Sequence, residues 1–146
     1  GTLARSKKDK KKKSSDTYKF NVDVVPLHAI LKDKPGLGIV KIDIEGYEVL
    51  AFYSIADDES CLENLFIVEY SPAQADKPIS ESLSYNQFLL EKFRIYNIGN
   101  WGWFSNAEEI GDEHSLRECD LRNNGHNTDL LLIPRHMPID PTTFLR

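Results

Sequence analysis

Apolar residues along this chain fall into short runs that predict an alternation of strands and helices. Runs rich in Val, Ile, Leu and Phe are typical of strands, whereas apolar residues spaced three and four apart indicate helices. The continuously apolar run before Glu69 predicts a strand buried on both faces. Strands are predicted at Phe20–Val25, Ile39–Asp43, Leu65–Tyr70, Arg94–Ile98 and Thr128–Ile133.

Helical patterns lie between these predicted strands. Pro26 suits a first helical turn, and the Ser84 and Gln87 pair predicts a capping box for a later helix. The region 100–127 is rich in Gly, Asn, Asp and Glu and is predicted to be largely irregular. Helices are predicted from Pro26 to Leu31, from Tyr47 to Ile55, after Ser84 and, as a short piece, at Ser115–Leu121.

The order of these elements predicts an α/β fold. The strand–helix–strand unit over residues 39–70 has short links, which is typical of a right-handed parallel crossover. Only a loop with a short helix separates residues 98 and 128, whereas a parallel crossover normally needs a helix. The last strand is therefore predicted to be antiparallel and to lie beside its neighbours. Its amino end would bring Asn124, His126 and Asn127 to the edge where the parallel strands end.

Acidic residues mark the ends of both predicted parallel strands. Asp43, Glu45 and Glu48 surround Gly46 at the turn into a helix, and Glu69 ends the next strand. Open α/β sheets bind ligands outside the carboxyl ends of their strands. A carboxylate at a helix amino end also stabilises the helix, but this needs only one acid rather than two. We therefore expect Asp43, Glu45 and Glu69 to be catalytic, with Asp43 and Glu45 on the same side of their strand.

Other polar and aromatic side chains are candidates for binding a substrate. Glu48 is either a substrate ligand or an ordinary first-turn acid. Trp101 and Trp103 alternate with glycine after a predicted strand, and they could wall a pocket or close the core. Asn127 reaches the same edge if the last strand is antiparallel. The predicted substrate-binding residues are Glu48, Trp101, Trp103 and Asn127.

The net charge of −5 conceals a strong asymmetry between the two ends of the chain. Residues 1–20 carry eight basic and two acidic residues, and the lysine run from Lys7 to Lys13 has no apolar face. Residues 1–19 are therefore predicted to be a disordered basic tail or insertion, serving as a tether or as a solvated linker. The rest of the chain is acidic, which gives no strong case for nucleic-acid binding.

Composition sets further bounds. No apolar run reaches the about 18 residues of a membrane span. The start lacks an initiator methionine and an apolar signal region, so a processed chain or a piece of a longer one is expected. Cys61 and Cys119 show no disulfide or zinc-ligand spacing, so neither is expected, and an intracellular, cytoplasmic location is favoured.

Three blocks of this sequence resemble FkbM-type methyltransferases, which depend on S-adenosylmethionine. Val25–Leu31 is similar to the helix before the family's fourth strand, Val40–Leu50 to its fourth-strand signature and Ile67–Tyr70 to its fifth strand. Phe93–Ile98 and Thr128–Pro134 are similar to its final hairpin, with an antiparallel seventh strand.

The resemblance implies a partial Rossmann-like class I methyltransferase sheet, comprising strands four to seven. It covers a domain at residues 20–137, followed by an extension at 138–146, and the usual acidic pair of the pre-strand helix is replaced by His28 and Ala29. The first three strands, which hold the cofactor in that family, have no counterpart upstream of Phe20. The missing strands would leave an exposed sheet edge through which the chain could self-associate.

The activity implied by this resemblance is O-methylation of a hydroxyl on a sugar or another small molecule. A carboxylate within about 2.6–3.2 Å of that hydroxyl could accept its proton. Two alternatives remain open. An Asp-x-Glu pair at a strand end also suits a metal-dependent nuclease, and a truncated fold could serve as a non-catalytic interaction module.

Overall fold

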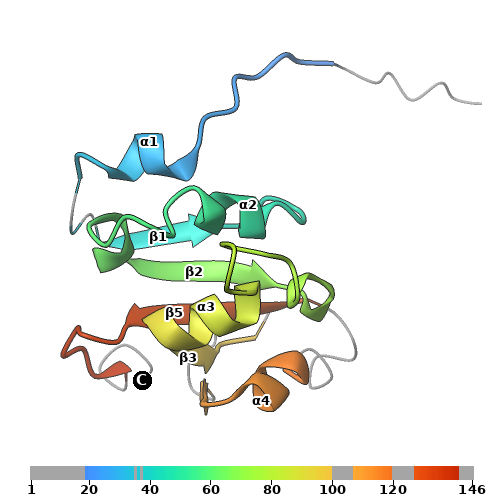
Figure 1. Cartoon of the computed structure of the whole chain (residues 1–146), viewed down its shortest axis with the longest axis vertical. Coiled ribbons are helices and arrows are strands. Elements are labelled where there is room, and N and C mark those ends of the chain that lie inside the picture. Colours follow the sequence, from blue (N-terminus) through green and yellow to red (C-terminus); the bar gives the residue numbers. More distant parts are fainter. Residues whose placement is uncertain (1–18, 35, 37, 100–106, 120–126, 142–146) are drawn as a thin grey trace, which may run out of the picture.

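The computed structural model describes residues 19–34, 36, 38–99, 107–119 and 127–141. Its centre is a five-stranded open sheet in the order β1-β2-β5-β3-β4, with helices along one face (Figure 1). The predicted α/β class is confirmed at this level. The strands are β1 (Ile39–Ile42), β2 (Leu65–Tyr70), β3 (Phe93–Asn97), β4 (Glu108–Ile110) and β5 (Thr128–Pro134).

The predicted strand directions are confirmed. β1 and β2 are parallel, with Ile42 opposite Val68. β5 lies between β2 and β3 and is antiparallel to both. β1 therefore forms one edge of the described sheet, and the carboxyl ends of β1 and β2 lie beside the amino end of β5.

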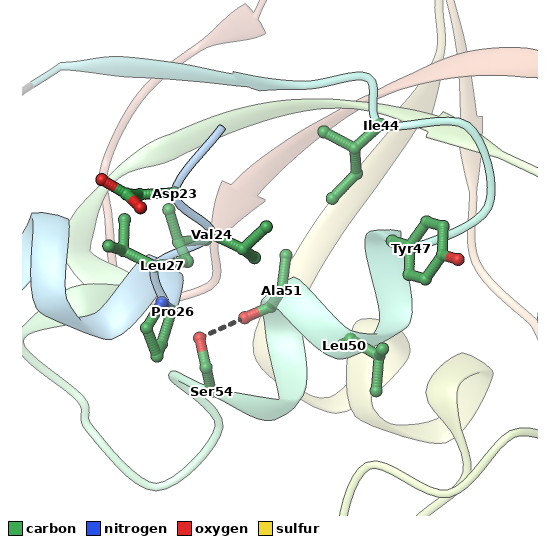
Figure 2. A pocket seen from close by; sticks show the side chains of 10 residues that line it. Asp23, Val24, Pro26, Leu27, Ile44, Tyr47, Leu50, Ala51 and Ser54 are labelled. Atoms are coloured by element: carbon green, nitrogen blue, oxygen red, sulfur yellow. Dashed lines mark hydrogen bonds between the residues drawn. The ribbon is translucent and has the colours of Figure 1, made fainter. Parts of the chain in front are cut away.

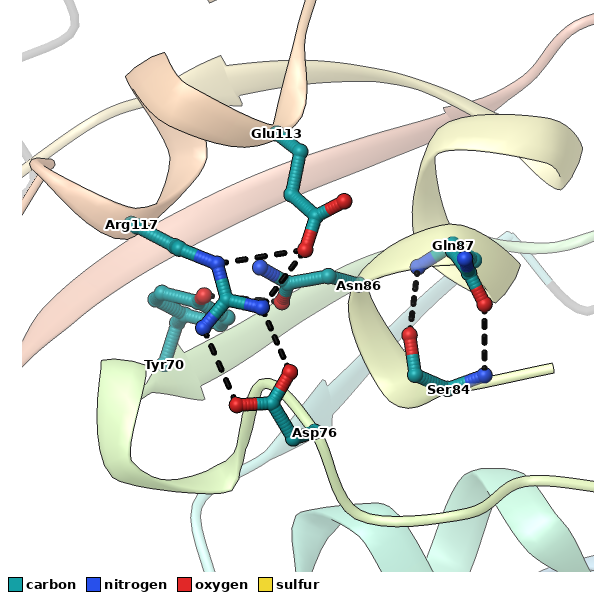
Figure 3. Close-up of polar contacts among 7 residues, drawn as sticks. All are labelled: Tyr70, Asp76, Ser84, Asn86, Gln87, Glu113 and Arg117. Carbon is teal, nitrogen blue, oxygen red and sulfur yellow. Dashed lines mark hydrogen bonds and ion pairs between the residues drawn. The ribbon is translucent and has the colours of Figure 1, made fainter.

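The helices are short and differ in how they are held. Ser84 and Gln87 form the predicted capping box, in which each side chain bonds the other residue's backbone N–H (Figure 3). Pro26 precedes the first helix but supplies no side-chain cap. The helices are α1 (Leu27–Leu31), α2 (Glu48–Tyr53), α3 (Tyr85–Lys92) and α4 (Glu113–Arg117), with 3₁₀ turns η1 (Cys61–Glu63) and η2 (Pro72–Gln74).

One prediction about the elements is wrong and another is shifted along the chain. Phe20–Val25 forms no strand; it is an exposed segment in which Val24 is 91% accessible, and none of the strands in the described residues pairs with it. The predicted short helix is present as α4, which begins two residues earlier, at Glu113, and ends at Arg117; Leu121 lies outside the described residues, and α4 follows the unpredicted strand β4. That strand forms because Ile110 and Glu109 pair with Ile95 and Tyr96 of β3.

The main core lies between the sheet and helices α2 and α3. The Phe52 ring contacts the Phe66, Phe88 and Phe93 rings at centroid distances of 5.3–6.2 Å, in tilted or edge-on geometry. Alternate residues of β2 face this core and are buried, while those on its other face are half-buried, which corrects the expectation of burial on both faces. The other face carries a smaller cluster around Leu131 and Ile133.

Polar contacts fix the periphery of the helical face. Arg117 of α4 makes two hydrogen bonds to Asp76 and also pairs with Glu113, so that α4 is joined to the segment after η2 (Figure 3). Beneath them the Tyr70 hydroxyl donates to Asn86 at 2.8 Å. Among the described residues, no helix is both long and apolar enough to cross a membrane.

Candidate functional site

The turn from β1 into α2 carries the acidic motif in a strained backbone. β1 ends at Ile42, so Asp43 and Glu45 lie in the turn. This corrects the expectation that both residues lie on the strand. Glu45 has φ of 54° and Gly46 of 96°, both in the left-handed region. This conformation costs a residue with a Cβ roughly 1–3 kcal/mol, and such residues cluster at functional sites.

Glu48 holds this turn in place. Its Oε1 accepts hydrogen bonds from the backbone N–H groups of Ile44 and Gly46, at 3.1 and 3.2 Å. Its Oε2 accepts one from the Gln74 side chain at 2.9 Å, and the residue is only 1% exposed. Burial opposes its ionisation, but these hydrogen bonds outweigh burial and lower the pKa of Glu48. Both carboxylate oxygens therefore brace the turn, and its role as a substrate ligand stays a prediction without geometric support.

The three acids expected to be catalytic come together. One carboxylate oxygen each from Asp43, Glu45 and Glu69 lies within 4.8 Å of the other two. Asp43 and Glu45 are exposed and Glu69 is half-buried. The side chain of Asn127, at the amino end of β5, hydrogen-bonds to Glu69. The antiparallel strand thus brings Asn127 to this edge as expected.

Four predicted residues lie outside the described part of the chain. They are Trp101, Trp103, Asn124 and His126.

Two further charged residues belong to the cluster and were missed by the sequence reasoning. Lys41 donates a hydrogen bond from Nζ to Asp43 Oδ2 at 2.9 Å. Asp129 of β5 is the register partner of Glu69. The alternation of side chains along paired strands could have identified Asp129, because in the antiparallel pairing it lies directly opposite Glu69 and on the same face.

Burial and charge repulsion favour protonation within this cluster. Burial is the main cause that raises the pKa of Glu69; Glu45 and Asp43 raise it further, while the Asn127 hydrogen bond opposes the change. Burial also raises the pKa of Asp129, against the attraction of Lys41. Glu69 is therefore a stronger proton acceptor than an ordinary glutamate. The donor set is all oxygen, which could also hold a hard divalent cation such as Mg²⁺.

A large hollow lies on the other side of the same turn. It has a volume of about 860 Å³ and separates α2 from the segment before α1 (Figure 2). Ile44 and Tyr47 of the turn line it together with Leu50 of α2 and Val24. The turn thus presents carboxylates to the edge of the sheet and apolar side chains to the hollow.

Comparison with known proteins identifies no relative. No family model, curated protein or solved structure matches this chain.

Proposed function

We propose that this chain supplies the acceptor side of an S-adenosylmethionine-dependent O-methyltransferase. The observation that supports this proposal is the convergence of Asp43, Glu45 and Glu69 where two parallel strands end. Carboxylates at this position can hold a hydroxyl group and accept its proton. The resemblance of the Val40–Leu50 block to FkbM-type enzymes favours methyl transfer among the reactions that use such a site.

The residues would divide the work between proton transfer and positioning. Asp43 or Glu45 accepts the proton of the substrate hydroxyl as the hydroxyl oxygen attacks the methyl group. Glu69, oriented by Asn127, holds a second polar group of the same substrate. Alignment of the hydroxyl supplies much of the rate, because a positioned reactant avoids the entropy cost of a bimolecular encounter.

The cofactor is assigned to no residue of this chain. S-adenosylmethionine supplies the methyl group when it is bound. Within the described residues, however, no strand is followed directly by a turn with more than one glycine, which is the usual cradle for such a cofactor. The proposal therefore concerns the acceptor side.

The test compares Asp43→Asn and Glu45→Gln with Glu81→Gln, an exposed acid in the loop before α3. We expect at least one of the two site variants to lose about 10²-fold or more in methyl transfer, because that is the usual contribution of a general base. Binding of labelled S-adenosylmethionine should stay unchanged in all three variants. Full turnover in both site variants would contradict the proposed roles.

Metal-dependent hydrolysis of a nucleic acid is the second candidate. The observation that favours it is that three carboxylate oxygens lie within 4.8 Å of one another, which suits a shared divalent cation. Methyl transfer that persists in EDTA would support the first function. Cleavage of single strands that needs Mg²⁺ or Mn²⁺ and is lost in Glu69→Gln would support the second.

A further inference from the structure

A second cluster of ligand atoms lies away from the acidic turn. His28 belongs to α1, Asp58 to the loop after α2, and Cys61 begins η1. One nitrogen, one oxygen and one sulfur atom from these residues all lie within 4.8 Å of one another. The closest pair is His28 Nε2 and Asp58 Oδ2, at 3.0 Å.

The chemistry of this set is specific. Mg²⁺ and Ca²⁺ prefer oxygen ligands, whereas Zn²⁺ takes imidazole, carboxylate and thiolate together. Zinc–ligand bonds of about 2.0–2.3 Å place the ligand atoms of a tetrahedral site about 3.3–3.8 Å apart. The ligand atoms of this cluster lie within 4.8 Å of one another, which is at most about 1.5 Å wider than that spacing.

The protein holds two of the three ligands in position. Asp58 Oδ1 accepts hydrogen bonds from the Ser60 hydroxyl at 2.6 Å and from the Ser60 backbone N–H at 3.0 Å. These bonds leave Oδ2 directed toward His28, as partners of a metal-bound carboxylate do. The Cys61 backbone N–H bonds the Asp58 carbonyl at 3.0 Å, so one tight turn carries both side chains.

Space for a fourth ligand lies beside the cluster. A hollow of about 370 Å³ is lined by His28 and Asp58, with Tyr53, Ser54 and Asp57 around it. It can hold a water molecule, and Asp57 offers another carboxylate at its rim. Three protein ligands with an open fourth position are a known arrangement for zinc.

We propose that His28, Asp58 and Cys61 form a zinc site that fastens α1 to the turn before η1. α1 has five residues, no side-chain cap and one buried residue, Leu31. A metal bond to His28 would give this helix a firm attachment. The simpler explanation is a hydrogen-bonded trio, in which Asp58 pairs with His28 and with the buried Cys61 thiol; it predicts no metal binding.

The test uses Co²⁺, which replaces Zn²⁺ and reports its ligands by absorption. EDTA-treated, reduced full chain is titrated with Co²⁺ and then with Zn²⁺. We expect thiolate-to-cobalt charge-transfer absorption and visible bands of a tetrahedral site, both of which Zn²⁺ removes. Cys61→Ser should abolish the charge-transfer band. Cys119→Ser should keep it, because Cys119 is also a buried cysteine but lies outside the cluster.

A second variant keeps the test decisive if Cys61→Ser does not fold. His28 is half-exposed, so His28→Ala should fold, and it should weaken Co²⁺ binding at least tenfold. Zn²⁺ should also raise the melting temperature of the wild-type chain but not that of His28→Ala. Absence of the band in the wild type, or a band of equal strength and affinity in His28→Ala, would overturn the proposal.

Discussion

The two faces of helix α2 differ sharply. Phe52 on one face is fully buried among aromatic rings, whereas Leu50 and Tyr47 on the other side are more than 60% exposed. The exposed side continues into the segment before α1, where Val22 and Val24 are also exposed. Of these residues, Val24, Tyr47 and Leu50 line the same hollow. One face of α2 thus packs into the aromatic core, which we call the core side, and the other exposes apolar side chains.

The largest effect on stability is expected from a cavity on the core side of α2. Phe52→Ala should lower the free energy of unfolding by about 3–5 kcal/mol, because it leaves a cavity among packed rings. Leu50→Ala, two residues away on the exposed face, should change it by less than about 0.5 kcal/mol. Urea denaturation followed by circular dichroism measures both. Equal losses of unfolding free energy in the two variants would show that the two faces of α2 contribute equally to stability.

The next largest effect is expected on self-association through the edge strand β1. In the described sheet β1 pairs on one side only, and Ile39 is 63% exposed. We expect the chain to self-associate through this edge, and Ile39→Lys to weaken association at least tenfold, because charge on an edge strand opposes pairing. Sedimentation analysis measures this.

A matched control is Ile30→Lys, an exposed isoleucine on α1 that should leave association unchanged. A wild-type chain that stays monomeric over the tested concentrations would refute this role of the edge.

Loss of a helix cap should have a smaller effect on stability. α3 packs on the core side and has a full capping box, whereas α1 has none. Ser84→Ala should therefore cost about 1 kcal/mol of unfolding free energy. Thermal or urea unfolding measures the loss, with Ser82→Ala, an exposed serine in the preceding loop, as the control. A Ser84→Ala chain as stable as the wild type would show that the cap contributes nothing.

The smallest effect on stability is expected at Glu69 of the acidic cluster. The pKa of Glu69 is raised in the folded state, so its ionisation disfavours folding at neutral pH. Glu69→Gln should be slightly more stable than the wild type near pH 7. The gain should shrink as pH falls through the raised pKa and vanish below the ordinary glutamate value of about 4.3. Unfolding curves across pH measure this, and a gain that grows toward acid pH would contradict it.

Local signals in the sequence predicted much of this fold. The Ser84 and Gln87 pair predicted its cap because both partners lie within one turn. The long helix-poor loop before Thr128 predicted an antiparallel last strand, which the pairing of β5 confirms. Phe20–Val25 was wrongly predicted because alternation identifies a strand only where a neighbouring strand can pair with it.

The features that sequence reasoning missed depend on contacts between distant residues. β4 is formed by Glu108–Ile110, a segment with little strand propensity, and it exists through its pairing with β3. Asp43, Glu45 and Glu69 were found because strand ends mark the edge of a sheet. The proposed zinc ligands were missed because His28 and Asp58, 30 residues apart along the chain, come together only in the folded structure.

The central claim is that Glu45 and Glu69 belong to one catalytic site. A double-mutant cycle on kcat/KM for methyl transfer tests it most directly, with Glu45→Gln, Glu69→Gln and the double variant. If Glu45 accepts the proton of the hydroxyl and Glu69 holds a second polar group of the same substrate, the double variant should lose little more than the worse single variant. Strictly additive losses, or no methyl transfer by the wild type, would contradict the account.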